Sequence, residues 1–206
     1  MIGKLLIAVP CYEDIKQRFA ESLNKLKRKL EDQEIPFEEK MTRGTMVHKA
    51  RDDLARFAIS GGFTHVLWID SDMVFEADAL ERLQETGKDI VCGLYISRHH
   101  PYPPVIFKAI EPRVIWHDRW ERELFRVAGC GFGLVLMKAE VLPQVMNANE
   151  GQCFLPTKDL GEDLAFCQRA QRLGYEIWCE PKVRCGHIGQ AVFMPAEGNR
   201  GWMIEN

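Results

Sequence analysis

The stretch Val66-Leu67-Trp68-Ile69-Asp70-Ser71-Asp72-Met73 runs four apolar residues directly into two carboxylates two positions apart. A short apolar run bounded by polar residues is typical of a strand buried on both faces, as in an α/β sheet. Side chains at i and i+2 of an extended segment point the same way, so Asp70 and Asp72 are predicted to face one crevice at the strand's carboxyl end. Two carboxylates that close repel each other unless a cation lies between them. The pair is therefore a candidate site for Mg2+ or Mn2+, with a polar turn after a strand as the plainer explanation.

The composition is that of an ordinary globular chain. It has 206 residues, 46% of them hydrophobic and 28% charged, with a formal net charge of -3. This length fits one domain with a sizeable core, and the lack of a basic excess argues against nucleic-acid binding by bulk charge. Seven cysteines without a C-x-x-C spacing are expected to be small buried hydrophobes, not a disulfide framework or a zinc site.

The absence of long apolar stretches bears on localisation. No segment approaches the ~18 apolar residues of a membrane span, and the run Leu5 to Pro10 is too short for a signal peptide. We therefore expect a cytoplasmic protein without a membrane span.

Two strand-helix units of similar length are predicted before the D-x-D stretch. Their elements are a strand at Lys4–Val9, a helix at Asp14–Asp32, a strand at Phe37–Met41 and a helix at Val47–Ser60, the last capped by Thr45. This rhythm is typical of right-handed βαβ crossovers and a parallel sheet.

The second half of the chain breaks this rhythm. After a helix at Ala77–Thr86 and a strand at Asp89–Ile96 comes the loop Ser97–Pro104, which is too rich in proline for a helix or a central strand. Short antiparallel strands are expected at Val105–Ala109, Val114–His117 and Glu123–Ala128. Further strands are expected at Leu134–Met137 and Tyr175–Cys179, and helices at Ala139–Met146 and from Gly161 to Gly174. The glycines of Gly129–Gly133 allow either close approach of a ligand or a tight bend.

The order of these motifs resembles a GT-A glycosyltransferase of the family 2-like type. Pro10 and Tyr12, the D-S-D pair, the glycine cluster, Gly161-Glu162-Asp163 and Gly186-His187-Ile188-Gly189 carry the likeness, which covers Leu5 to about Gly189. It implies an α/β, Rossmann-like GT-A mixed sheet within a single domain, 1-206. The parallel N-terminal half, 1-97, would bind the nucleotide, and an α+β half, 98-206, would take the acceptor. No long C-terminal extension is seen, so processive synthesis through a membrane is not expected.

The resemblance also implies roles for individual residues. It implies a UDP- or GDP-sugar donor, with Pro10, Tyr12 and Arg43 around the nucleotide, and a divalent metal on Asp70 and Asp72 that bridges the diphosphate.

Residue chemistry extends these roles. His187 as a third ligand would make Mn2+ at least as suitable as Mg2+. Arg51 is expected either to neutralise phosphate or to be a solvated helix residue, and Arg98 with His99-His100 could form a lid.

The resemblance places Asp163 in the catalytic role, as the general base of an inverting transfer. An Asp with an ordinary pKa is ionised at neutral pH, so no pKa shift is needed. Glu162 is expected to point elsewhere, toward the acceptor or the helix end. The acceptor itself stays open among a glycan, a lipid, a protein, a metabolite and modified DNA.

Two other classes of protein compete with this hypothesis. Leu67–Val74 also fits the D-x-D-x-T/V pattern of haloacid-dehalogenase-like phosphatases, but that motif ends the first strand of its fold and here two strand-helix units precede it. A non-catalytic nucleotide-binding module or a sugar-phosphate nucleotidyltransferase is the second alternative. The latter usually has a G-x-G-T-R loop after the first strand, where this chain has Pro10-Cys11-Tyr12-Glu13.

Overall fold

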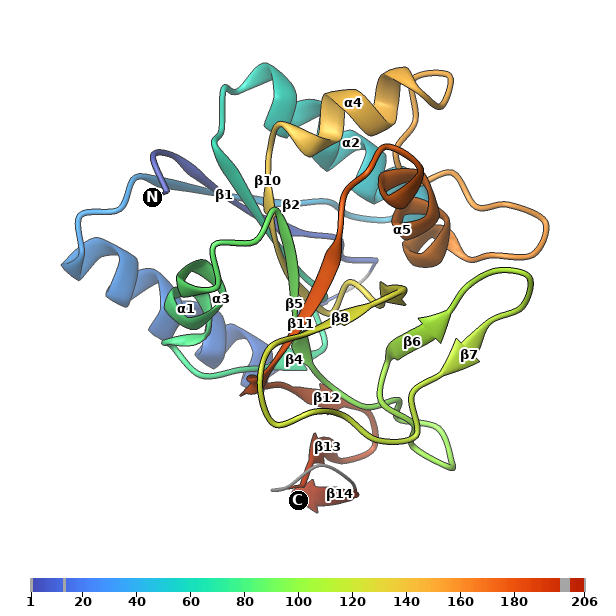
Figure 1. Cartoon of the computed structure of the whole chain (residues 1–206). Coiled ribbons are helices and arrows are strands. Elements are labelled where there is room, and N and C mark those ends of the chain that lie inside the picture. The colour runs from blue at the N-terminus through green and yellow to red at the C-terminus, as the bar shows by residue number, and fades with distance from the viewer. Residues whose placement is uncertain (1, 13, 197–200, 206) are drawn as a thin grey trace.

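The computed structural model describes residues 2–12, 14–196 and 201–205, and its central feature is a twisted mixed sheet (Figure 1). The strands of this sheet follow the order β2-β1-β3-β10-β5-β11-β8. Their bounds are β1 (Leu5–Val9), β2 (Phe37–Met41), β3 (His65–Ile69), β5 (Ile90–Leu94), β8 (Phe125–Val127), β10 (Leu134–Lys138) and β11 (Ile177–Arg184).

The direction of the strands changes across the sheet. β1 pairs in parallel with both β2 and β3, as the strand-helix rhythm predicts. β10 is antiparallel to β3 on one side and to β5 on the other, and β11 is parallel to β5. The C-terminal half of the chain therefore supplies the strand that joins β3 to β5.

Helices cover both faces of the sheet. α1 (Gln17–Asp32) and α3 (Ala79–Glu85) lie on one face, and α2 (Val47–Ser60), α4 (Val141–Asn147) and α5 (Glu162–Arg172) lie on the other (Figure 1). β1 shows why: Leu5 and Ile7 join the core under α1 and α3, while Leu6 and Ala8 join the core under α2, α4 and α5. Continuous apolar strands are buried on both faces, so two layers of helices are needed.

Two smaller sheets lie beside the central sheet, and the second contains the predicted strands at Val105–Ala109 and Val114–His117. One has the order β14-β13-β12-β4 and the other β7-β6-β9. Their bounds are β4 (Met73–Val74), β6 (Ile106–Ala109), β7 (Ile115–Trp116), β9 (Gly129–Cys130), β12 (Gly186–Ile188), β13 (Val192–Pro195) and β14 (Trp202–Glu205). β4 follows the D-x-D pair directly and pairs with β12, which joins His187 to Met73 in register.

Some element predictions need correction. The N-cap of α2 is Met46 and no side chain caps it, so the expected cap at Thr45 is wrong. The strand expected to end at Cys179 continues to Arg184, because it follows β5 through a register shift between Glu180 and Arg184.

The cysteines match expectation. None of the seven cysteines is in a disulfide and all are buried, which confirms the prediction that they are small buried hydrophobes. No helix in the described part of the chain has the length and apolar character that a bilayer crossing requires.

Candidate active site

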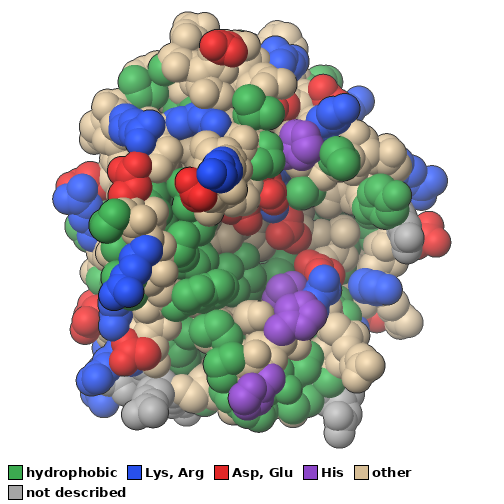
Figure 2. Space-filling view, turned by 90° about the vertical axis from the view of Figure 1, so that its right-hand side faces the viewer, with side chains coloured by type: hydrophobic (Ala, Val, Ile, Leu, Met, Phe, Trp, Pro, Cys, Tyr) green, Lys and Arg blue, Asp and Glu red, His purple; other side chains and the backbone are tan. Residues whose placement is uncertain are grey.

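A cavity of about 460 Å³ opens where β1 and β3 end and α5 begins. Its lining brings together residues from four distant parts of the sequence: Pro10 and Tyr12, Arg51, Asp70 and Asp72, and Glu162 with Asp163. Figure 2 shows acidic side chains gathered in a hollow on one face of the molecule, above a stretch of hydrophobic surface. The carboxyl ends of strands in an open α/β sheet are where ligands bind, and the D-x-D pair lies there as predicted.

Arg51 joins three of the acidic side chains. Its Nη2 donates to Asp70 Oδ1 at 2.8 Å, and its Nη1 donates both to Glu162 Oε1 at 2.8 Å and to Asp163 Oδ1. Burial opposes ionisation, but the three carboxylates raise the pKa of Arg51 above its ordinary value, so it stays charged.

The position of Arg51 on α2 explains its burial. The side chain is 2% exposed, and its guanidinium lies 5.3 Å from the ring centroid of Phe132. Arg51 is therefore buried in the protein and is not a solvated residue. Val47, the first residue of the helix, is 42% exposed. The Arg51 guanidinium is committed to carboxylates in this structure, and its phosphate contact remains a prediction.

Asp163 has an environment that sequence analysis did not anticipate. It lies in the first turn of α5, and the backbone N–H of Phe132 donates to its Oδ2 at 3.3 Å. Burial raises the pKa of Asp163 to about 7, against the lowering effect of Arg51 and with added repulsion from Glu162 and Asp70. The expectation of an ordinary pKa is therefore wrong.

Glu162 also departs from expectation. Its carboxylate accepts from the same Arg51 Nη1 as Asp163, although adjacent helix residues were expected to diverge. Both carboxylates therefore meet at one nitrogen of Arg51.

Asp72 is held by a second set of cationic groups. Arg98 Nη1 donates to Asp72 Oδ2 at 2.7 Å and to the Ile188 carbonyl at 3.0 Å, and His187 Nε2 lies 3.4 Å from the same Oδ2. Burial opposes ionisation here too, but hydrogen bonding and charge from His187, with the charge of Arg98, lower the pKa of Asp72.

The tautomer of His187 follows from its other nitrogen. Nδ1 lies 3.0 Å from the Ile96 carbonyl, which can only accept, so Nδ1 carries a proton. In the neutral ring Nε2 then presents a lone pair toward the Asp72 carboxylate. Two lone pairs that face each other require a proton or a metal cation between them, which is the chemistry of a carboxylate-imidazole ligand pair.

The predicted metal site is assembled in part. Within the described residues no three His, Cys, Asp or Glu side chains converge as metal ligands. Asp72 and His187 come together, whereas Asp70 turns its Oδ1 to Arg51. The cations that relieve the repulsion between the two aspartates are thus Arg51 and Arg98, one on each.

Only some of the residues expected around the nucleotide line the cavity. Pro10 and Tyr12 line the cavity, and the Tyr12 side chain is 68% exposed. Arg43 is exposed and does not line the cavity, although its loop is tied to Tyr12 by a bond from Gly44 N to the Tyr12 carbonyl at 3.1 Å.

The glycine cluster packs against protein. A Cβ at Gly131 would lie 2.0 Å from Tyr95 Oη, and one at Gly133 would lie 2.9 Å from the Tyr95 ring. Tyr95 is buried, and its ring meets His187 edge to face at 5.5 Å between centroids. The sequence analysis did not identify Tyr95 as a residue of the site, because its only sequence signal is its position directly after β5. The glycines therefore make room for Tyr95 behind the site.

Comparison with known proteins identifies relatives in fold. No family model matches the sequence, and no curated protein matches it. The structure of A197 from STIV aligns with a TM-score of 0.64 and 18% identity, over 98% of this chain and 94% of that one. GalNAc-T7 with UDP, GalNAc and Mn2+ aligns with a TM-score of 0.52 and 10% identity, over 92% of this chain and 44% of that one. UDP-glucose pyrophosphorylase complexed with UDP-glucose aligns with a TM-score of 0.52 and 11% identity, over 88% of this chain and 90% of that one. The predicted fold class, a Rossmann-like mixed α/β sheet of the GT-A kind, is thus confirmed.

Proposed function

We propose that this chain is a metal-dependent glycosyltransferase that moves a sugar from a nucleotide-diphospho-sugar to an acceptor hydroxyl with inversion. The observation that carries the proposal is the cavity that brings Asp70, Asp72 and Asp163 together at the carboxyl ends of β1 and β3. Two of the proteins that share the fold were crystallised with UDP and GalNAc or with UDP-glucose, which supports a donor of this class. A volume of about 460 Å³ also lies within the usual range for small-molecule sites.

Metal binding is assigned to Asp72 and His187, with Asp70 as a further oxygen ligand. The 3.4 Å approach of His187 Nε2 to Asp72 Oδ2 is the structural feature that supports this. Mn2+ suits a set of carboxylate and imidazole ligands, and Mg2+ is the alternative. When bound, the metal supplies positive charge for the diphosphate leaving group.

Proton removal is assigned to Asp163. An acceptor hydroxyl that attacks the anomeric carbon must lose its proton, and a carboxylate within hydrogen-bond reach can accept it. A pKa of about 7 suits this role, because a base works best when its pKa is near the working pH. Arg51 and the Phe132 N–H hold the carboxylate in place, and Glu162 shares the same guanidinium.

A panel of UDP- and GDP-sugars tests the donor and metal assignments. Calorimetry with Mn2+ should give tight binding of one nucleoside diphosphate, and EDTA should abolish it. Asp72→Asn and His187→Ala should each weaken the metal-dependent part of the binding, by roughly 10- to 100-fold for loss of a ligand or its partner. Equal affinity of the diphosphate with Mn2+ and with EDTA would exclude the metal role.

Asp163→Asn tests the base. It should keep donor and metal binding and lose transfer by about 100-fold or more, the scale of general-base catalysis. Asp159→Asn is a matched control, since Asp159 lies exposed in the loop before α5. Near-normal transfer by Asp163→Asn would refute the assignment, and a product that keeps the donor's anomeric configuration would refute inversion.

A further inference from the structure

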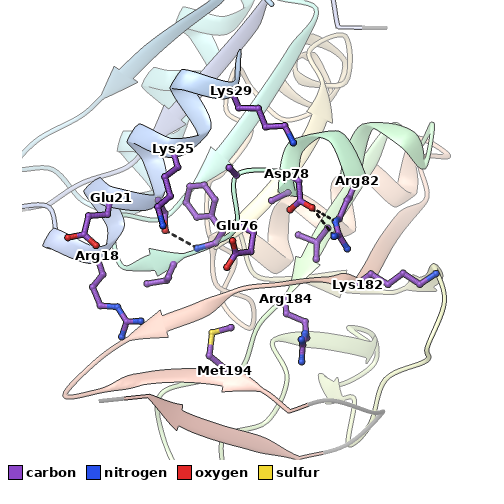
Figure 3. A pocket seen from close by; sticks show the side chains of 16 residues that line it. Arg18, Glu21, Lys25, Lys29, Glu76, Asp78, Arg82, Lys182, Arg184 and Met194 are labelled. Atoms are coloured by element: carbon purple, nitrogen blue, oxygen red, sulfur yellow. Dashed lines mark hydrogen bonds and ion pairs between the residues drawn. The ribbon is translucent and has the colours of Figure 1, made fainter. Parts of the chain in front are cut away.

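A second cavity, of about 660 Å³, lies between α1, the segment from β4 to α3, β11 and β13 (Figure 3). It is larger than the candidate active site, and the assigned chemistry does not use it. Six basic side chains and three acidic ones line it: Arg18, Lys25, Lys29, Arg82, Lys182 and Arg184 against Glu21, Glu76 and Asp78. This twofold excess of cations contrasts with the net charge of -3 for the whole chain.

The small sheet separates this cavity from the D-x-D site. His187 on β12 points to Asp72, whereas a Cβ on the preceding Gly186 would lie 2.6 Å from Met194 Sδ, and Met194 lines the second cavity. Successive residues of a strand face opposite sides. The two cavities therefore lie on opposite sides of β12, and a ligand in one does not occupy the other.

The basic side chains can exchange their present partners for a ligand. Lys25 makes no hydrogen bond or ion pair with any described residue. Arg82 pairs with Asp78 at 2.8 Å, with the two side chains 48% and 35% exposed. Lys182 pairs with Glu123, which is even more exposed. Exposed ion pairs contribute little, so a phosphate group can compete for these cations.

Part of the cavity lining is apolar. Val74, Phe75, Val183 and Met194 contribute to it, and the Phe75 N–H is fixed by a bond to Ser22 Oγ at 3.2 Å. A concave site that combines apolar surface with converging polar groups can hold a small molecule.

We infer that this cavity binds a small molecule carrying two or more phosphate groups. Six cationic side chains on several elements can bind more than one phosphate group. Arg82 has a planar guanidinium, which binds phosphate through two parallel hydrogen bonds. A polymer or a membrane is less suited, because a wide anionic surface would also meet the acidic remainder of a chain with net charge -3. The inference stands independently of the proposed glycosyl transfer.

Tripolyphosphate in the presence of EDTA is the probe, since the D-x-D site should need a metal to hold phosphate. Calorimetry should show saturable binding to the wild-type chain, and amide NMR shifts should concentrate at residues 74–79 and 182–184. Lys25→Gln and Arg82→Gln should each weaken binding by roughly tenfold, the scale of one charge-assisted hydrogen bond. Both side chains are exposed and lie outside the core, so the variants should fold.

Arg28→Gln is the control, because Arg28 is exposed on the same helix as Lys25 and does not line the cavity. It should leave the affinity unchanged. Absence of saturable binding, or equal losses in Arg28→Gln and Lys25→Gln, would overturn the inference. So would tighter binding of a single-stranded oligonucleotide or of anionic vesicles through the same residues, since either would identify a macromolecular ligand.

Discussion

Asp163 shares one buried guanidinium with two other carboxylates, and this arrangement has a cost for folding. Its pKa is about 7 in the folded chain and near 3.8 in an unfolded one. Between these values the folded protein holds a proton that the unfolded protein has released. The free energy of unfolding therefore falls as pH rises through this window.

Asp163→Asn should remove this penalty. Asparagine resembles the protonated acid and cannot ionise, so we expect the variant to be more stable than the wild type at pH 8, by about 1 kcal/mol or roughly 3 °C in Tm. The difference in stability should vanish near pH 4, where the side chain at position 163 is neutral in both folded proteins. Thermal melts of both chains without metal, from pH 4 to pH 8, measure it. A variant less stable than the wild type at pH 8 would contradict the raised pKa.

Arg98 competes for the carboxylate that the proposed metal needs. Its Nη1 lies 2.7 Å from Asp72 Oδ2, and the side chain is 41% exposed. Arg98→Gln should therefore increase the affinity for Mn2+ without nucleotide, by roughly threefold to tenfold, because one charge-assisted hydrogen bond no longer has to break. Calorimetry with MnCl2 measures this, with Arg119→Gln as an exposed control. Unchanged or weaker Mn2+ binding would show that Arg98 does not oppose the metal.

At the scale of the element, the glycine cluster before β10 is the feature most open to test. A Cβ at position 131 would overlap Tyr95 Oη at 2.0 Å and approach Val105 Cγ1 at 2.8 Å. Gly131→Ala should therefore cost about 1–3 kcal/mol of stability, the usual range for overpacking. Gly161→Ala is the control, since it has no atom within 4 Å of the new Cβ. Urea unfolding compares the two, and equal midpoints would contradict the packing role.

The main elements could be predicted because their pattern is local. β1, β2 and β3 are bounded by polar or turn residues, and α1 carries a regular stripe at Phe19, Leu23, Leu26 and Leu30 that the structure buries. By contrast β12, β13 and β14 were not predicted, since they form by pairing with β4 and with each other in a region of short, mixed sequence. Such strands depend on tertiary partners, so the local sequence pattern that would predict them is weak.

For the candidate site, the sequence predicted which residues meet in the cavity but not the contacts that they make there. The placement of Asp70, Asp72 and Asp163 in one cavity followed from strand ends and motif order. The contacts that govern their charge did not, because Arg51 is 111 residues from Glu162 and Arg98 is 26 residues from Asp72. The roles of these residues in catalysis remain predictions.

At the scale of the whole molecule, the buried cysteines give a global test of the fold. None of the seven is in a disulfide, and Cys11, which lines the candidate active site, is 4% exposed. Burial raises the pKa of Cys185 to about 12, so its thiolate is scarce at neutral pH. We expect almost no reaction with a thiol reagent in the native protein and seven equivalents in guanidinium chloride. Fast reaction of several cysteines in the native state would contradict the packing of both core layers.

The insertion of β10 between β3 and β5 has a consequence for synthesis of the chain. β3 ends at Ile69 and β5 at Leu94, but the strand that pairs with both is not made until Lys138. Until then, each of these apolar strands presents an open edge toward the missing partner, and open edges are templates for pairing with other chains. The ribosome must therefore add about 40 more residues, a few seconds of elongation, before the sheet can close. Chains that stop short of β10 should aggregate even though they already contain the D-x-D pair.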